Sequence, residues 1–157
     1  MDRAGLVGED GPTHHGVFDI AYLRCIPNLI ICSPINEIEL RNIMYTAQLG
    51  LEHPIAIRYP RGRGRILDWQ KSMSKMTIGK GVLLKQGSKI AILSTGPIGN
   101  VATEIINELG SNSGIAHYNF PFIKPLDRKL LTQIIQKFDH IITLEDGSAI
   151  GGFGSAI

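Results

Sequence analysis

Two short apolar runs that flank a helical segment constrain the fold of this chain most strongly. Residues 28–33 (NLIICS) have a proline immediately before and after them, and residues 54–59 (PIAIRY) follow the helical segment. Asn36 stands where a helix N-cap is expected, and apolar residues recur at helical spacing from Ile38 to Ala47. A strand–helix–strand order favours two parallel strands joined by a crossover helix. The sequence therefore predicts an α/β fold.

A second series of strands and helices is predicted after residue 80, and a helix at 16–25 precedes the first series. Gln86–Ser88 separates two of the new strands and predicts a hairpin. Gly110 and Asp127 stand at positions that cap helices. The predicted elements of the second series are strands at 81–85, 89–94, 115–122 and 140–145 and helices at 100–109 and 126–138. The sequence thus predicts two small three-layer α/β units with mostly parallel sheets.

A linker is predicted between these units, at residues 66–78. Neither the strand period nor the helix period is sustained there. The predicted units span residues 1–65 and 79–157. Three apolar residues of the linker could dock on a neighbouring surface: Ile66, Leu67 and Trp69.

The composition excludes several classes of partner. The 157-residue chain carries 16 Lys and Arg against 14 Asp and Glu, a net charge of +2, which is too small to argue for nucleic-acid binding. Its longest apolar runs, Leu29–Cys32 and Ile90–Leu93, are far too short to span a membrane. The first residues resemble no signal peptide, and Cys25 and Cys32 are too few for a disulfide framework or a zinc site. We therefore expect a cytoplasmic protein without a nucleic-acid or membrane partner.

The loop at residues 8–16 (GEDGPTHHG) holds the densest group of chemically active side chains. Its glycines allow the backbone to approach a ligand closely, and the start of the helix that follows favours an anion. His14 could donate to a developing oxyanion or relay a proton, and Asp10 could orient the imidazole or bind a substrate hydroxyl. The alternatives are a solvated, capped loop and a metal site that also uses His15.

Four arginines lie within residues 58–65, at the end of a predicted strand. Ligands of parallel α/β sheets gather beyond the carboxyl ends of the strands. Arginine suits phosphate because its planar fork forms paired, charge-assisted hydrogen bonds. Together with Arg3, this arginine-rich segment could bind a phosphorylated metabolite. A solvated basic loop is the alternative, and a nucleic-acid-binding tail is disfavoured because no aromatic residues alternate with the arginines.

Several segments, taken in order, resemble a known enzyme family. The string GEDGPTHHG is similar to the pyrimidine-binding domain of transketolase-like, thiamine-diphosphate-dependent enzymes. The longer string at residues 2–34, which begins with DRAG, and the later RYPRG resemble the 1-deoxy-D-xylulose-5-phosphate synthases in particular. The strings FIKPLD and TLEDGSAIGGFGS are similar to the family's C-terminal domain. The resemblance implies that residues 1–65 and 79–157 are incomplete copies of these two domains.

This resemblance implies a transferase that condenses pyruvate with glyceraldehyde 3-phosphate and releases CO2. The product, 1-deoxy-D-xylulose 5-phosphate, feeds isoprenoid and thiamine biosynthesis. The implied cofactors are thiamine diphosphate and Mg2+, and the implied assembly is a homodimer. Arg3 of DRAG and Arg61 of YPRG match residues that hold the acceptor's phosphate. Asp10 matches a residue near the substrate hydroxyls and carbonyl, and His14 matches a histidine that contacts the reacting substrate beside the thiazolium.

The chain also departs from the family's pattern. It lacks the GDG…N motif that binds diphosphate and magnesium, the glutamate that activates the aminopyrimidine, and the aromatic residues that stack on that ring. We therefore assign no cofactor-binding residue and expect the chain by itself to be inactive and to bind thiamine diphosphate poorly. Gly151–Gly154 predicts a tight strand-to-helix turn, because it lacks the Lys-Ser/Thr of a P-loop. Transketolase, the β subunit of a 2-oxo-acid dehydrogenase and a non-catalytic sugar-phosphate-binding module are the alternative functions.

Overall fold

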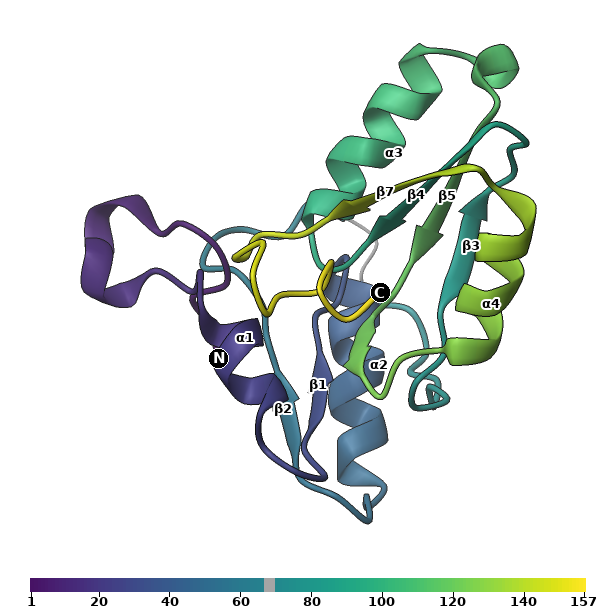
Figure 1. Ribbon diagram of the computed structural model, residues 1–157. Coiled ribbons are helices and arrows are strands. Elements are labelled where there is room, and N and C mark those ends of the chain that lie inside the picture. Colours follow the sequence, from purple (N-terminus) through teal and green to yellow (C-terminus); the bar gives the residue numbers. More distant parts are fainter. Residues whose placement is uncertain (67–69) are drawn as a thin grey trace.

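Two β-sheets organise the molecule (Figure 1). The computed structural model describes residues 1–66 and 70–157. One sheet has three strands in the order β2-β1-β6, and the other has four in the order β3-β5-β4-β7. Both sheets contain parallel and antiparallel pairs, so the predicted α/β fold is confirmed and its sheets are mixed. Within the described part of the chain, no helix is long and apolar enough to cross a membrane.

The first strand–helix–strand unit forms as predicted. Strands β1 (Ile30–Cys32) and β2 (Ile55–Ile57) pair in parallel, and α2 (Glu37–Gln48) connects them. The Asn36 side chain accepts a hydrogen bond from the backbone N–H of Glu39 at 2.9 Å, which confirms the predicted cap. The unpaired donors of the first helical turn are thereby partly satisfied.

Helices cover both faces of β1. Ile31 packs in one core cluster with Ile20 of α1 (Asp19–Arg24), whereas Ile30 and Cys32 pack in a second cluster with Ile43 of α2. This alternation is the period-two pattern of a strand buried on both sides. Helix α1 is shorter than predicted, because the residues before it form a loop closure and an irregular turn.

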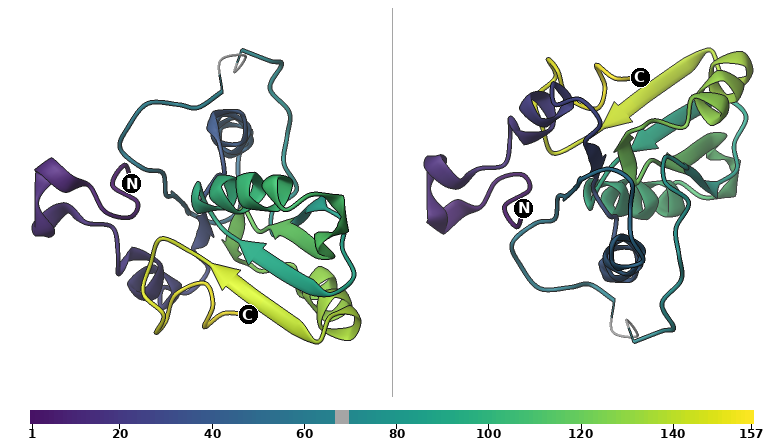
Figure 2. Two further views of the ribbon diagram at one scale, coloured as in Figure 1. Left: turned by 90° about the horizontal axis from the view of Figure 1, so that it is seen from above. Right: turned by 90° about the horizontal axis from the view of Figure 1, so that it is seen from below.

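The four-stranded sheet is also enclosed by helices on both faces (Figure 2). Leu93 and Tyr118 share a core cluster with Ile134 of α4 (Arg128–Lys137). His117, the residue before Tyr118, faces the opposite side of the sheet. Its Nδ1 lies 3.2 Å from Thr103 Oγ1 on α3 (Ile98–Glu108). The predicted three-layer arrangement is therefore confirmed. The strands of this sheet are β3 (Val82–Lys85), β4 (Ile90–Ser94), β5 (Ile115–Asn119) and β7 (His140–Leu144).

The predicted hairpin between β3 and β4 is wrong. Strand β5 lies between them and pairs antiparallel with β3 and parallel with β4. The N–H groups of Ser88 and Lys89 donate to the carbonyl of Gly114 at 2.9 and 2.8 Å, so the turn is anchored on the residues that lead into β5. The apolar strand β4 gains a parallel neighbour on each side, which buries it more fully than a two-stranded hairpin would.

The strand predicted at residues 115–122 divides into two strands that belong to different sheets. Strand β5 ends at Asn119, and β6 (Phe122–Lys124) pairs antiparallel with β1. Pro121 lies at the break, where proline cannot donate to a ladder, and its carbonyl accepts from the N–H of Ser33 at 2.9 Å. A strand from the C-terminal half therefore completes the first sheet, and one core cluster contains residues from both halves.

Residues 70–78 of the predicted linker are attached to the first unit. The N–H of Met76 donates to Thr46 Oγ1 on α2 at 2.8 Å, and the Met76 side chain packs against the second core cluster. Leu67 and Trp69, which were predicted to dock, lie outside the described residues. The domain boundaries proposed from the sequence stay a prediction.

A polar seam joins α2 to the four-stranded sheet. The Glu39 carboxylate accepts from the backbone N–H of Ile35 at 2.7 Å and from Asn119 Nδ2 at 3.0 Å. Nearby, the N–H of Gly96 donates to the carbonyl of Ser33 at 3.1 Å. Burial raises the pKa of the Glu39 carboxyl, although the bonds from Ile35 and Asn119 oppose this shift.

Replacing Glu39 with glutamine should flatten the pH dependence of stability. In the wild type, the folded chain keeps the Glu39 proton to a higher pH than the unfolded chain, so the free energy of unfolding falls as the pH rises above the ordinary carboxyl pKa of 4.5. Glutamine keeps an acceptor for Asn119 and cannot ionise. Urea titrations between about pH 4 and 7 should show that the free energy of unfolding falls less with pH in Glu39→Gln than in the wild type. Glu108→Gln, on an exposed position of α3, should follow the wild type. An equal change of the free energy of unfolding with pH in all three proteins would contradict the prediction.

Candidate functional site

The loop at residues 5–16 is closed at its base by two glycines. The N–H of Gly5 donates to the carbonyl of Gly16 at 3.1 Å, and the N–H of Gly16 donates back to Gly5 at 2.9 Å. A Cβ at Gly16 would collide with the carbonyl of Arg3, so this close approach requires glycine. Figure 1 shows the loop, in purple, projecting away from the sheets. Its conformation is thus fixed at the point where it leaves the core.

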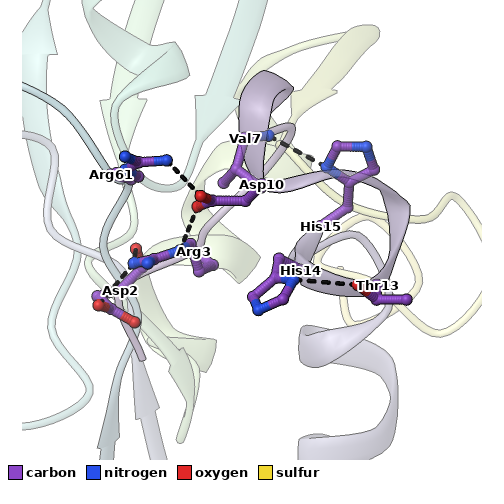
Figure 3. A network of polar contacts seen from close by, with 8 residues as sticks. All are labelled: Asp2, Arg3, Val7, Asp10, Thr13, His14, His15 and Arg61. Carbon is purple, nitrogen blue, oxygen red and sulfur yellow. Dashed lines mark hydrogen bonds and ion pairs between the residues drawn. The ribbon is translucent and has the colours of Figure 1, made fainter.

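The N-terminal segment runs beside the segment that follows β2. The N–H of Tyr59 donates to the carbonyl of Met1 at 2.9 Å, and the N–H of Ala4 donates to the carbonyl of Tyr59 at 3.1 Å. This pairing brings Arg3 close to Arg61, although the two residues are far apart in the sequence (Figure 3).

The Asp10 carboxylate lies between the two arginines predicted to bind phosphate (Figure 3). Its Oδ2 is 2.7 Å from Arg3 Nε, and its Oδ1 accepts a hydrogen bond from Arg61 Nη1 at 2.5 Å. Partial desolvation acts in the opposite direction, but the Arg61 and Arg3 guanidiniums together lower the pKa of the Asp10 carboxyl. The side chains of Arg3 and Arg61 are 34% and 46% exposed. The Arg3–Asp10–Arg61 cluster therefore keeps cationic surface open to solvent.

His14 is not bonded to Asp10. Its Nδ1 lies 3.0 Å from Thr13 Oγ1, and the neighbouring His15 accepts a hydrogen bond from the backbone N–H of Val7 at 3.1 Å through its own Nδ1. Asp10 therefore does not orient the His14 imidazole, contrary to one of the two roles considered for it. Among residues 1–66 and 70–157, no group of three or more His, Cys, Asp or Glu side chains is placed so that it could hold a metal ion.

The arginines of the arginine-rich segment lie in different places. Arg61 joins the cluster, whereas Arg65 forms an ion pair with Glu104 on α3 at 2.8 Å. Arg58 is fully buried and forms an ion pair with Asp19 at 2.6 Å. The sequence analysis missed this role because it grouped Arg58 with the other three arginines as one anion site, although Arg58 also lies within the strand predicted at 54–59. The signal was its position directly after three apolar strand residues, where the side chain still belongs to the sheet.

A cavity of about 330 Å³ lies beside the cluster. It is lined by Arg61 and Arg63, by Asn36 and Glu37 at the start of α2, and by Pro97 before α3. This place is beyond the carboxyl ends of β1 and β2, where the sequence predicts a ligand site. The Arg3–Asp10–Arg61 cluster thus lies next to a hollow that is open to a small ligand.

The glycine-rich turn near the C-terminus is folded around a carboxylate of the same chain. Glu145 accepts hydrogen bonds from the N–H groups of Phe153 and Gly154 at 2.8 and 2.9 Å. Arg24 of α1 donates to the carbonyl of Gly152 at 2.8 Å. These amides are satisfied internally, which supports a tight turn in place of a phosphate cradle.

Comparisons with protein families match both halves of the chain. Residues 1–65 match the pyrimidine-binding domain of transketolase, and residues 79–157 match the transketolase C-terminal domain. A solved structure titled as a split-gene transketolase, an inactive beta4 tetramer, superposes with a TM-score of 0.80 at 28% identity, over 92% of this chain and 48% of that one. A transketolase from Campylobacter jejuni superposes with a TM-score of 0.64 at 18% identity, over 92% of this chain and 26% of that one, which shows a shared fold.

Curated relatives named 1-deoxy-D-xylulose-5-phosphate synthase match along the whole chain. The protein from Bacteroides thetaiotaomicron is 57% identical, and the protein from Cytophaga hutchinsonii is 50% identical. Each match covers 100% of this chain and 25% of the relative. The chain therefore spans about a quarter of the length of these relatives.

Proposed function

The chain belongs to the transketolase family, and we propose that it supplies the acceptor-binding part of a 1-deoxy-D-xylulose-5-phosphate synthase. In this reaction pyruvate loses its carboxylate as CO2, and the remaining two-carbon acyl unit joins the aldehyde carbon of glyceraldehyde 3-phosphate. One proton is taken up, and the product is 1-deoxy-D-xylulose 5-phosphate. We further propose that the full-length enzyme is a cytoplasmic homodimer that uses thiamine diphosphate and Mg2+.

The observation that carries the proposal is the convergence of Arg3 and Arg61 on a single anion. Both guanidiniums reach opposite oxygens of the Asp10 carboxylate, at 2.7 and 2.5 Å. A pair of guanidiniums in this position suits the phosphate of glyceraldehyde 3-phosphate, because phosphate accepts several charge-assisted hydrogen bonds at once. The exposed remainder of each arginine side chain gives the phosphate access.

Asp10 and His14 would act on the other end of the acceptor. The lowered pKa of Asp10 keeps it ionised and able to accept a hydrogen bond from a substrate hydroxyl. His14 is exposed on the same loop, and an imidazole can donate a proton to the oxygen that gains charge when the new C–C bond forms. The arginines would therefore bind the phosphate, while the loop carboxylate and imidazole would face the reacting carbons.

The cofactor side of the site does not fit the residues of this chain. The described residues contain no acidic cluster for Mg2+, and the amides of the C-terminal glycine turn already bond to Glu145. We therefore derive no step through thiamine diphosphate from this chain and propose that its binding groups lie elsewhere in the full-length enzyme.

Release of CO2 from pyruvate by the full-length enzyme, supplied with thiamine diphosphate and Mg2+, tests the proposal. We expect glyceraldehyde 3-phosphate to stimulate the release and the purified 157-residue chain to be silent. Ketol transfer between sugar phosphates without CO2 release would show a transketolase instead. That outcome is the main rival because a structure titled as a transketolase is 28% identical. Turnover by the chain alone would overturn the expectation that it is inactive.

A further inference from the structure

Arg58 is the most deeply buried charged side chain near the Arg3–Asp10–Arg61 cluster. It is fully buried, and its partner Asp19 is 3% exposed. Its backbone N–H donates to the carbonyl of Cys32 at 2.9 Å, which continues the pairing of β1 with β2. Arg58 therefore extends the sheet and points its guanidinium into the protein, three positions before Arg61 in the sequence.

Acceptors from two other segments of the chain, residues 16–19 and the turn after β7, meet at the Arg58 guanidinium. Its Nε donates to Asp19 Oδ2 at the start of α1, at 2.6 Å. Its Nη2 donates to the carbonyl of Gly16 at 2.7 Å and also to the carbonyl of Asp146, in the turn after β7. The planar fork of arginine can reach these three acceptors at once, whereas the single ammonium of lysine cannot reproduce this geometry.

The Gly16 carbonyl connects Arg58 to the loop that carries Asp10. This carbonyl also accepts from the N–H of Gly5, so Arg58 bonds to the closed base of the loop. The Asp146 side chain packs against the same base, since a Cβ at Gly5 would lie 3.2 Å from Asp146 Cβ. One side chain thus fixes the base of the loop against both the sheet and the C-terminal turn.

We infer that Arg58 is a positioning residue that sets the separation of Arg3 and Arg61 for the acceptor's phosphate. It does not touch the substrate. Arg61 is connected to Arg58 by a short stretch of backbone, and Arg3 is connected to it through the closed base of the loop. If the hydrogen bonds of the Arg58 guanidinium were weakened, the two phosphate-binding arginines could move apart. This inference rests on the proposed function.

Steady-state kinetics of the full-length enzyme test the inference by comparing the KM for the acceptor, glyceraldehyde 3-phosphate, with the KM for the donor, pyruvate. Arg58→Lys should raise the KM for glyceraldehyde 3-phosphate by about tenfold or more and leave the KM for pyruvate within about twofold. Activity with unphosphorylated glyceraldehyde should change little, because that acceptor has no phosphate for Arg3 and Arg61 to bind. Asp19→Asn, which keeps the two carbonyl contacts of Arg58, should raise the KM for glyceraldehyde 3-phosphate by about threefold. Arg128→Lys, at an exposed position of α4, is the matched control.

The outcomes separate the inference from the proposed function. A lower kcat with both acceptors at an unchanged KM, or an equal rise in both KM values, would mean that Arg58 serves stability alone and would overturn the inference. Where Arg58→Lys fails to fold, the KM ratio of Asp19→Asn decides in the same way. A wild-type enzyme without acceptor-stimulated CO2 release would overturn the proposed function, and the inference with it.

Discussion

Replacing Arg61 with alanine in the full-length enzyme is expected to raise the KM for glyceraldehyde 3-phosphate by about 10- to 150-fold. This range corresponds to about 1.5–3 kcal/mol, the usual contribution of a charge-assisted hydrogen bond. Arg61 shares the Asp10 carboxylate with Arg3, so its loss leaves a single guanidinium for the phosphate. The KM for pyruvate should stay nearly unchanged, because pyruvate carries no phosphate. Steady-state rates of CO2 release at varied acceptor concentration measure both constants.

Two further variants sharpen this result. Arg61→Lys keeps the charge but loses the planar fork, so its KM for the acceptor should lie between those of the wild type and Arg61→Ala. Arg128→Ala removes another exposed arginine, on α4, and should leave both constants unchanged. An Arg61→Ala enzyme with a normal preference for the phosphorylated acceptor would contradict the assignment of the phosphate site.

Replacing His14 with alanine should reduce kcat by about 10²- to 10⁴-fold, the range typical of a lost general acid or base. The KM for glyceraldehyde 3-phosphate should change far less, because His14 bonds to Thr13 and stands apart from the contacts of the Arg3–Asp10–Arg61 cluster. Single-turnover measurements with pyruvate alone and with both substrates would show which half of the reaction is slowed.

The adjacent histidine provides the matched control. His15 accepts the N–H of Val7 and so stabilises the loop from within. Its replacement by alanine should lower thermal stability with a loss of kcat well below that of His14→Ala. Equal losses of kcat in the two variants would indicate that loop folding, and not chemistry at His14, controls the rate.

Local sequence signals determined the elements of secondary structure. The cap at Asn36, the two apolar runs around α2 and the cap at Asp127 all depend on neighbours within a few residues, and the structure confirms each of them. The glycine-rich loop and the arginine-rich segment were also recognisable, because glycine and arginine spacing is visible in the chain itself. The α/β class followed from the order of these elements.

Tertiary structure alone decided which strands pair and which charged groups meet. Strand β5 lies between the two strands of the predicted hairpin, and β6 pairs with β1 of the other sheet, so both pairings join residues that are distant in the sequence. Asp10 bonds to two arginines and not to His14, and Arg58 is buried against Asp19, because residues distant in sequence come together there. Such contacts depend on how all the elements pack together, and short-range sequence patterns do not contain that information.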